Sequence, residues 1–407
     1  MTCKYKVKIK DIQYNYKVQM TDIQSKYKFK VFCTGYDDSE IKDKIDAMYE
    51  AWPKASGEGE TITLNDTANT TMSIDLKGNT SQDGTPTPDD PVAVSVVSGD
   101  NSIKVEGKNL FDIVLDSSIG NTILYKTYTL QPNTQYTIST NTYLSSNVIA
   151  NIFAQAGTSL TPKTLVNGVN GSKTITSDEN GNITLGYRNY QNELDYSSGN
   201  YYTQLEKGET ATSYEPYQSQ TYPISLGNIE LCKIGDYQDS IVKDNGKWYL
   251  NKQIGKVVLD GSEANWSNQF GINLFSLQAF LNNNKFIVGY GLSNYYKYNS
   301  IQSGINAGTV NGEFALQESS GNYNLFMKNT DYSSTDNFKA WLVSNNVSIY
   351  YPLQTPTYTE ITDSTLISQL EAIKEAESYS GQTNISQTND DKPFILTAKA
   401  LKDLSNL

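Results

Sequence analysis

Hydrophobic and polar residues alternate along the first part of the chain, in three units that begin eleven residues apart at Tyr5, Tyr16 and Tyr27. Lysines fill most of the polar positions of the first and third units. Such alternation is typical of a strand with one buried and one solvated face. With about seven strand residues and a four-residue turn in each unit, the pattern predicts a three-strand meander.

A helical spacing of apolar residues follows the meander. Asp37, Asp38 or Ser39 can cap this helix, and Pro53 stops it. The residues on its apolar face are Ile41, Ile45, Met48 and Trp52. Residues 1–53 therefore predict a module of meander plus helix, too small for a large core of its own, which we expect to pack on a partner or on its own copies.

Two later regions consist of short apolar runs separated by turns rich in Asn, Gly, Ser and Thr. Residues 106–218 include LYKTYTL, QYTIST, NIFAQ and ITLGYRNY, and residues 263–353 include KFIVGYGL, GEFALQ, YNLFMKN, KAWLV and VSIYYPL. Strands at this spacing are typical of β-sandwiches and jelly rolls. We therefore expect an all-β fold with two sandwich or jelly-roll domains.

The segments between and after these regions are expected to connect them. Residues 54–105 form a linker and β connector, and residues 219–262 a second β connector with a hairpin signal at Asp244–Asn245–Gly246. Residues 354–407 predict a short helix, capped by Asp363 or Ser364, and a final strand, FILTAKAL. The apolar face of that helix comprises Leu366, Leu370 and Ile373.

Charge is distributed unevenly over the 407 residues. The formal net charge is −12, whereas residues 1–35 hold eight lysines against two aspartates, a local +6. Because nucleic-acid phosphates need clustered Lys and Arg, we expect no nucleic-acid partner. The cationic first segment differs most from the rest of the chain and is the candidate anchor.

The residue types restrict the chemistry further. Histidine is absent, which removes the commonest general base near neutral pH and the commonest metal ligand. Cys3, Cys33 and Cys232 are odd in number and far apart, so they predict neither a disulfide framework nor a zinc site. The 30 tyrosines suit exposed β-surfaces and binding faces, because the ring buries area while the hydroxyl stays in water. We expect no cofactor.

Signals for secretion and membrane insertion are not expected. The start, MTCKYKVKIK, alternates charge and lacks the apolar segment of a signal peptide. No apolar run approaches the length of a membrane span.

Five phrases of the chain are long enough to be distinctive. They are GNTSQDGTPTPDDPV (residues 78–92), GKNLFD (107–112), QLEKGETATSYEPY (204–217), LCKIGDYQDSIVKDNGKWYLNKQIGKVVLDGSE (231–263) and SGQTNISQTNDD (380–391). They resemble segments of minor structural and tail-fibre proteins of phages that infect low-GC Gram-positive bacteria. The lysine-rich repeat lies outside this resemblance, so tail, baseplate and capsid surface stay open as attachment points.

The resemblance implies a virion protein, assembled in the host cytoplasm, released by lysis and exposed on the particle surface. The part from GKNLFD to YEPY is similar to carbohydrate-binding jelly rolls. The resemblance thus implies a homotrimer that projects sandwich domains toward a host surface glycan.

The opening repeat is the candidate docking module for another virion protein, whether of tail, baseplate or capsid. Its strands would pair with that protein and its lysines would meet an acidic surface. The alternative is a solvated lysine face that keeps edge strands from aggregating. The candidate anchoring residues are Tyr5, Lys6, Lys8, Tyr16, Lys17, Tyr27 and Lys28.

Two tyrosine-rich stretches are candidate sugar sites. Sugars are bound by aromatic faces and by planar amide, carboxylate or guanidinium groups. GYRNYQNELDY, expected as a loop, offers Tyr187, Arg188, Asn189, Tyr190, Asn192 and Asp195, and SNYYKYNS offers an exposed platform of Tyr295, Tyr296 and Tyr298. The alternatives are an ordinary loop between strands and a strand edge packed in a trimer seam.

Metal binding and glycan cleavage are the remaining possibilities. Asp-rich turns such as TPDDP and DGSE could hold calcium, but Asp is common in turns for backbone reasons, so we expect no metal. Glu206, Glu209 and Glu215 cluster in sequence, but their phrase is typical of a closing strand and exit turn, and nothing sets the separation that hydrolysis needs.

The sequence therefore predicts a non-enzymatic, all-β virion fibre, tail or baseplate protein that binds host polysaccharide through its sandwich domains. The first alternative is a purely structural head fibre, decoration protein or baseplate spacer. The second is a glycan depolymerase.

Overall fold

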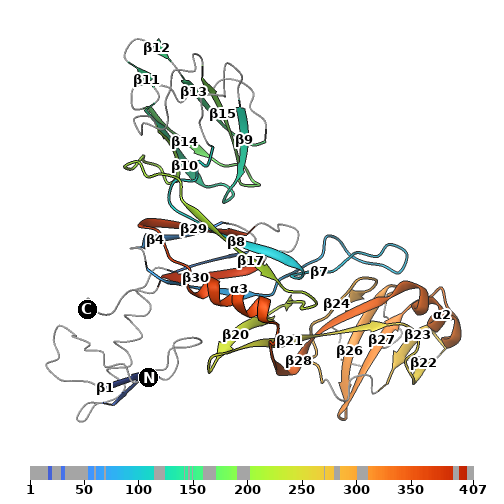
Figure 1. Cartoon of the computed structure of the whole chain (residues 1–407). Helices are drawn as coiled ribbons and strands as arrows, with labels where there is room; N and C mark the ends of the chain where they lie inside the picture. The colour runs from blue at the N-terminus through green and yellow to red at the C-terminus, as the bar shows by residue number, and fades with distance from the viewer. Residues whose placement is uncertain are drawn as a thin grey trace.

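The computed structural model describes residues 17–20, 29–32, 54–58, 61–67, 70–113, 124–141, 143–144, 147–148, 150–158, 171–189, 202–269, 271–278, 285–299, 310–387 and 394–400. Within these ranges the protein is all-β, with two helices. Figure 1 shows a central body that carries two lobes, one above it and one to its lower right. No helix in the described ranges is both long and apolar enough to cross a membrane.

The central body contains one core shared by two sheets and a helix. The sheets have the orders β17-β8-β29-β4 and β24-β28-β21-β20-β5-β30-β3. In β5, Met72, Ile74 and Leu76 are buried and the intervening residues are not, the alternation of a strand with one face on a core. The strands are β3 (Lys54–Glu58), β4 (Ile62–Thr67), β5 (Met72–Lys77), β8 (Asp100–Glu106), β17 (Ser219–Ser225), β20 (Ser240–Asp244), β21 (Lys247–Leu259), β24 (Leu292–Ser293), β28 (Val347–Glu360), β29 (Gly381–Gln387) and β30 (Ile395–Ala400).

Three distant stretches of the chain build this core. Its buried residues come from 62–105, 222–248 and 361–400. Much of the sequence that was expected to connect domains thus forms a body with a core of its own. The first and second stretches each also contain a short strand pair, β6 (Thr80–Ser81) with β7 (Ser95–Val96) and β18 (Lys233–Ile234) with β19 (Tyr237–Gln238).

Helix α3 (Ser364–Lys374) covers one side of the core (Figure 1). The Asp363 carboxylate accepts a hydrogen bond from the Leu366 N–H at 2.7 Å, the interaction of an N-cap. Leu366, Leu370 and Ile373 are all buried. The predicted helix, its cap and its apolar face are confirmed.

Glu371 joins α3 to the hairpin of β20 and β21. Its carboxylate accepts hydrogen bonds from Lys243 Nζ at 2.5 and 2.6 Å and from Trp248 Nε1 at 2.9 Å.

The turn between β20 and β21 confirms the predicted hairpin. Asn245 and Gly246 both have positive φ, as a two-residue type I′ turn requires.

The first lobe (residues 107–217) is inserted between two paired strands of the central body. β8 ends at Glu106 and β17 begins at Ser219, and these residues are register partners. The Gly107 N–H donates to the Gln218 carbonyl at 3.0 Å. The chain therefore leaves and rejoins the central body at adjacent points.

Asn109 closes the neck of the first lobe. Its Nδ2 donates to the Glu215 carbonyl at 2.9 Å, and its Oδ1 accepts from the N–H groups of Phe111 at 2.9 Å and Leu205 at 3.2 Å. Lys108 pairs with the Glu215 carboxylate at 2.9 Å. GKNLFD and YEPY, far apart in the sequence, thus meet where the lobe begins and ends.

The second lobe (residues 254–353) consists of the outer halves of β21 and β28 and of the chain between them. Leu259 and Val347 are register partners at the outer end of this pair. A five-stranded sheet, β22-β23-β27-β26-β25, and helix α2 share a core with the outer halves of β21 and β28. The elements are β22 (Trp266–Gln269), β23 (Leu274–Leu277), β25 (Lys297–Tyr298), β26 (Glu313–Ser319), β27 (Asn322–Lys328) and α2 (Thr335–Asn345).

One predicted strand of this lobe is wrong. KAWLV (residues 339–343) lies in α2. Ser334 caps this helix, Asn346 ends it with a positive φ of 45°, and Phe338 and Leu342, four residues apart, are buried on one face. The apolar run alone suits a strand, whereas the cap and the helical spacing of the buried residues decide for a helix.

A buried carboxylate holds the joint between the central body and the second lobe. The register of β21 and β28 shifts between Lys252 and Ile254. Asp239, which is 0% exposed, accepts hydrogen bonds at this point from the N–H groups of Gln253 at 2.7 Å and Ile254 at 3.0 Å. It also accepts from Lys252 Nζ at 2.6 Å and from the Cys232 N–H at 2.9 Å. The carboxylate thus satisfies backbone donors that the irregular ladder leaves free.

The TPTPDDP segment forms a second connection to the same lobe. The Gln82 side chain donates to the carbonyls of Val92 at 3.0 Å and Ser293 at 2.9 Å, and the Val92 N–H donates to the Asn294 carbonyl at 2.9 Å. A Cβ on Gly312 would lie 3.1 Å from Pro88, so the proline-rich loop also touches β26 at its start. This phrase therefore acts as a strap between the bodies.

Part of the opening repeat lies within the described residues. β1 (Lys17–Met20) pairs antiparallel with β2 (Phe29–Phe32). They match strands expected in the second and third units. The first unit and the expected helix before Pro53 lie outside the described residues.

We predict that Asp239→Asn lowers the unfolding free energy by about 2–4 kcal/mol, because it removes a buried charge that pairs with Lys252 and accepts backbone hydrogen bonds. Asp236→Asn, the same change at an exposed position of the nearby turn, should alter it by less than about 0.5 kcal/mol. Urea unfolding measures both. Equal effects would contradict this account of the joint.

A second prediction concerns acid. Partial burial favours the neutral form of Glu371, but hydrogen bonds from Lys243 and Trp248 outweigh it and lower the pKa below its ordinary value of 4.5. A lowered folded-state pKa stabilises the fold above pH 4.5, and this contribution is lost as pH falls through the folded-state pKa. The stability difference between the wild type and Glu371→Gln should therefore shrink below that pH in thermal melts. A difference that stays constant down to pH 3 would contradict the assignment.

Candidate functional site

The first lobe consists of two three-stranded sheets around one core. The sheets have the orders β14-β10-β16 and β13-β15-β9. Buried residues from both sheets form the core, among them Tyr136, Ile138, Ile152, Ile183 and Leu185. The strands are β9 (Leu124–Thr129), β10 (Gln135–Thr140), β13 (Ala150–Ala156), β14 (Gly171–Thr176), β15 (Asn182–Asn189) and β16 (Thr203–Lys207), with a short pair, β11 (Tyr143–Leu144) and β12 (Asn147–Val148).

The face of β13-β15-β9 that points away from this core is the candidate site. Because side chains alternate along a strand, burial of Tyr128, Ile152 and Leu185 in the core places their neighbours on the other face. On that face Tyr125 and Phe153 are both register partners of Gly186. Two aromatic side chains thus flank a position that has none.

Tyr125 is the most accessible part of this row. Its side chain is 57% exposed, whereas Phe153 is half-buried and Gly186 is buried. A glycine in the middle of a central strand often marks a place of close approach. The row therefore forms a floor of backbone bordered by rings.

The next row of the same face is polar. Thr127 and Gln155 are the register partners of Thr184. The hydroxyls of Thr127 and Thr184 lie 2.9 Å apart, and Thr184 donates to the Gly157 carbonyl at 2.6 Å. Further along, Thr129 donates to the Asn182 side chain at 3.1 Å. Hydroxyl and amide groups thus stand beside the aromatic row.

Lys126, the charged residue of β9, lies on the other face. Lys126 pairs with Asp112 at 2.5 Å, and Tyr128 donates to the same carboxylate at 3.0 Å. Burial and the neighbouring Asp112 carboxylate both raise the pKa of Tyr128, so its hydroxyl stays protonated. The rows at Tyr125 and Thr127 are uncharged, which suits a neutral polar ligand.

The first predicted sugar site falls partly on this sheet. The predicted loop is wrong at its start: Tyr187, Arg188 and Asn189 form the end of β15, because all three pair with β13. Arg188 pairs with Asn151, at a position two residues beyond Gly186. Tyr190, Asn192 and Asp195 lie outside the described residues.

The second predicted site is not an exposed platform. Tyr296 is 0% exposed, and its hydroxyl accepts a hydrogen bond from Asn329 at 2.9 Å. The half-buried Tyr298 accepts from the Gly289 N–H at 3.0 Å, and Tyr295 meets Trp341 edge to face with centroids 5.4 Å apart. All three rings contribute to the core of the second lobe, which explains why the tyrosines are clustered there.

The predicted anchoring residues are scarcely covered by the described ranges. Lys17 begins β1 and is the register partner of Phe32. Tyr5, Lys6, Lys8, Tyr16, Tyr27 and Lys28 lie outside the described residues. Docking by this segment stays a prediction.

The three clustered glutamates have separate structural surroundings. Glu206 is buried in β16 and accepts hydrogen bonds from the Thr212 N–H at 2.8 Å, the Thr212 hydroxyl at 2.6 Å and Gln204 Nε2 at 2.7 Å. Glu215 pairs with Lys108, and Glu209 is exposed. The predicted placement of these glutamates in a closing strand and its exit turn is confirmed.

In the two acidic turns, side chains accept hydrogen bonds from backbone N–H groups of the same turn. In DGSE the Asp260 carboxylate accepts from the Ser262 N–H at 2.9 Å, and Glu263 accepts from the Asp260 N–H at 3.0 Å. In TPDDP the Asp90 N–H donates to the Thr87 hydroxyl at 3.0 Å. Across the described ranges, no group of three or more Cys, Asp or Glu side chains is placed to hold a metal ion.

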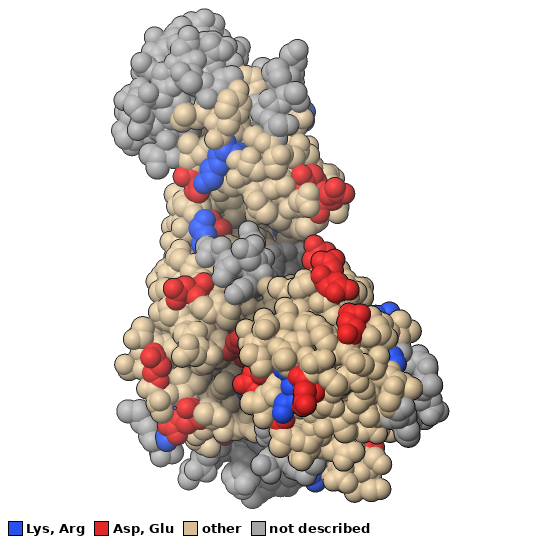
Figure 2. Space-filling model, turned by 90° about the vertical axis from the view of Figure 1, so that its right-hand side faces the viewer, with Lys and Arg blue, Asp and Glu red and all other residues tan. Residues whose placement is uncertain are grey.

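Charges are dispersed on the face drawn in Figure 2. Blue and red patches are small and scattered over the tan surface, and several blue patches lie beside red ones. No family model, curated protein or solved structure matches this chain.

Sequence reasoning missed Tyr125, Phe153 and Gly186 as a group. The alternation in LYKTYT and ANIFAQA indicates two strands, and Gly186 inside a strand run is a signal of close approach. The signal that joins them is the pairing register, which brings together residues 28 and 33 positions apart along the chain.

We predict that Glu206→Gln lowers the unfolding free energy of the lobe by about 1–3 kcal/mol, because a buried acceptor of three hydrogen bonds is altered. Glu209→Gln, three residues away and exposed, is the matched control and should leave the melting temperature unchanged. Differential scanning calorimetry measures both. If the exposed change were the more destabilising, the structural role of Glu206 would be refuted.

Proposed function

We propose that this chain is a virion fibre, tail or baseplate protein that binds a host surface polysaccharide through the Tyr125–Gly186–Phe153 face of its first lobe. The observation that carries the proposal is the pairing of an aromatic row with an uncharged hydroxyl and amide row. Sugar rings stack their C–H faces on aromatic side chains, and their hydroxyls bond to such polar groups. The segment that runs from GKNLFD to YEPY resembles carbohydrate-binding jelly rolls, and this resemblance supports the same function.

The position of the lobe supports display toward a large ligand. Its neck is one pair of adjacent strands, so the face lies on a body separate from the central core (Figure 1). Polysaccharides are long, and several copies would engage one strand at once. Binding that is weak per site then becomes strong by avidity, which fits the proposed homotrimer on a particle surface.

Cleavage of the glycan has less support than binding. Hydrolysis needs two carboxyl groups on either side of the bond at a set separation. Glu206 is buried and hydrogen-bonded, and Glu215 is paired with Lys108. We therefore propose a binding protein that releases no oligosaccharide from host wall material.

The test uses the full chain and a panel of purified wall polysaccharides from low-GC Gram-positive bacteria. Tyr125→Ala should weaken binding to the retained glycan about tenfold, because loss of the stacking contact removes on the order of 1–2 kcal/mol of binding free energy. Tyr125→Phe should retain binding, because the stacking face remains. Affinity electrophoresis measures the three proteins.

Tyr290→Ala is the control, since Tyr290 is also exposed, at 37%, and lies outside the first lobe. It should bind as the wild type does. If the wild type is retained on no polysaccharide of the panel, or if Tyr125→Ala binds as well as the control, the proposal is wrong.

A further inference from the structure

The second half of β28 is unusually open. Every residue from Gln354 to Glu360 is exposed, so neither face of this stretch rests on a core. Thr357 to Glu360 pair with Tyr249 to Lys252 of β21, and no other strand in the described part of the chain pairs with them. The Gln354 N–H, at the start of the stretch, donates to the Lys285 carbonyl at 2.8 Å. A strand open on both faces and along one edge is a template for pairing with another chain.

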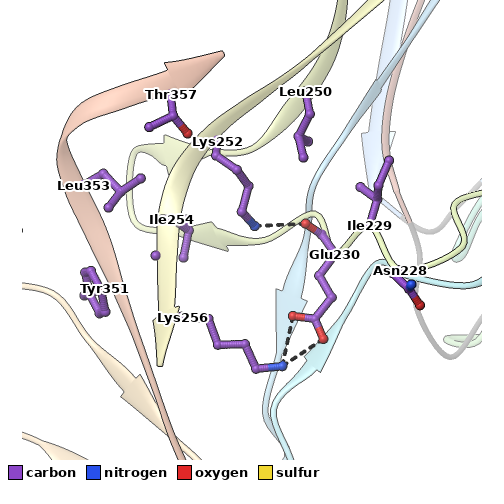
Figure 3. A pocket seen from close by; sticks show the side chains of 11 residues that line it. Asn228, Ile229, Glu230, Leu250, Lys252, Ile254, Lys256, Tyr351, Leu353 and Thr357 are labelled. Carbon is purple, nitrogen blue, oxygen red and sulfur yellow. Dashed lines mark hydrogen bonds and ion pairs between the residues drawn. The ribbon is translucent and has the colours of Figure 1, made fainter. Parts of the chain in front are cut away.

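A groove of about 400 Å³ lies beside this strand, at the joint held by Asp239 (Figure 3). Its volume lies in the range of ligand-binding sites. The floor is apolar, and the side chains that form it include Ile229, Leu250, Ile254 and Leu353. Asn228 and Thr357 add polar groups at the wall.

The charged groups of the groove already have partners. Lys256 Nζ lies 2.8 and 3.0 Å from the two carboxylate oxygens of Glu230, and Lys252 donates to the Glu230 carbonyl at 2.9 Å and to Asp239 (Figure 3). The groove is therefore neutral in sum. It suits an uncharged, largely apolar group with one polar end better than it suits an ion.

The same strand carries a side chain of that chemistry on its opposite face. Thr357 lines the groove and pairs with Lys252, whereas Tyr358 pairs with Asn251 and therefore points the other way. Tyr358 is 63% exposed, more than Tyr125 at 57%. One strand thus presents a projecting ring on one side and a receptive groove on the other.

We propose that Tyr358 of one copy of this chain inserts into the groove of a second copy. Cyclic assemblies larger than a dimer need two different complementary surfaces on each subunit, and β28 supplies both. A tyrosine ring buries apolar area on the floor, and its hydroxyl reaches the polar wall. This inference rests on the self-association in the proposed function and names the surface responsible for it.

The first test measures mass. The full chain should be an oligomer larger than a dimer by light scattering, and Tyr358→Ala should raise its dissociation constant about tenfold or more, as expected for a buried aromatic anchor. Tyr290→Ala is the matched control and should assemble normally. A monomer at every concentration, or equal assembly of Tyr358→Ala and the control, would overturn the inference.

The second test locates the contact while keeping the tyrosine. Asn228→Cys, at the groove, and Glu360→Cys, on the face of Tyr358, are made as separate chains with Cys3 and Cys33 replaced by serine. Cys232 can remain, because burial raises the pKa of its thiol to about 12 and keeps it unreactive. The mixed chains are treated with a short bis-maleimide.

The mixture should give a covalent dimer that contains one chain of each kind. If the Glu360→Cys chain alone formed a cross-linked dimer as readily as the mixture does, two β28 edges would pair symmetrically. That result would overturn the inference. So would an intact oligomer without the mixed product. Because neither assay involves glycan, failure here is distinct from failure of polysaccharide binding, and a monomer that still binds glycan would refute self-association alone.

Discussion

The backbone ladders that pair β8 with β17 and β21 with β28 are the constraint on which the rest of the molecule depends. The first lobe begins where β8 ends, at Glu106, and finishes before β17 begins, at Ser219, whereas the second lobe includes the outer halves of β21 and β28. A buried core can therefore form from three distant stretches of chain while both lobes stand outside it. Breaking either ladder would separate a lobe from the body that positions it.

The side chains at these joints explain the most distinctive phrases of the sequence. Asn109 of GKNLFD binds the Glu215 carbonyl of YEPY, and Asp239 holds the irregular point of β21. Gln82 and Val92, at either end of the TPTPDDP strap, bind the second lobe. These phrases secure the scaffold. The candidate binding face uses ordinary strand residues, Tyr125 and Phe153, whose importance depends on their place beside Gly186.

Local signals in the sequence were sufficient for some elements and insufficient for others. Asp363 and the spacing of Leu366, Leu370 and Ile373 predicted α3, because a helix is defined by neighbours in sequence. The apolar residues of KAWLV suit a strand or a helix, and the burial of Phe338 and Leu342, four residues apart, decides for the helix. The insertion of both lobes, the burial of Tyr296 and the row across Gly186 depend on long-range pairing, which no local pattern contains.

The central claim is that the face of β13-β15-β9 that points away from the lobe's core, where Tyr125 is exposed, binds a neutral polysaccharide. It is tested most directly by recording amide NMR spectra of the full chain, or of its deuterated form, during titration with oligosaccharides from a retained wall polysaccharide. The account predicts that shifts concentrate at Tyr125, Thr127, Phe153, Thr184 and Gly186. Shifts confined to the second lobe or the central body, with these amides unmoved at saturation, would contradict it.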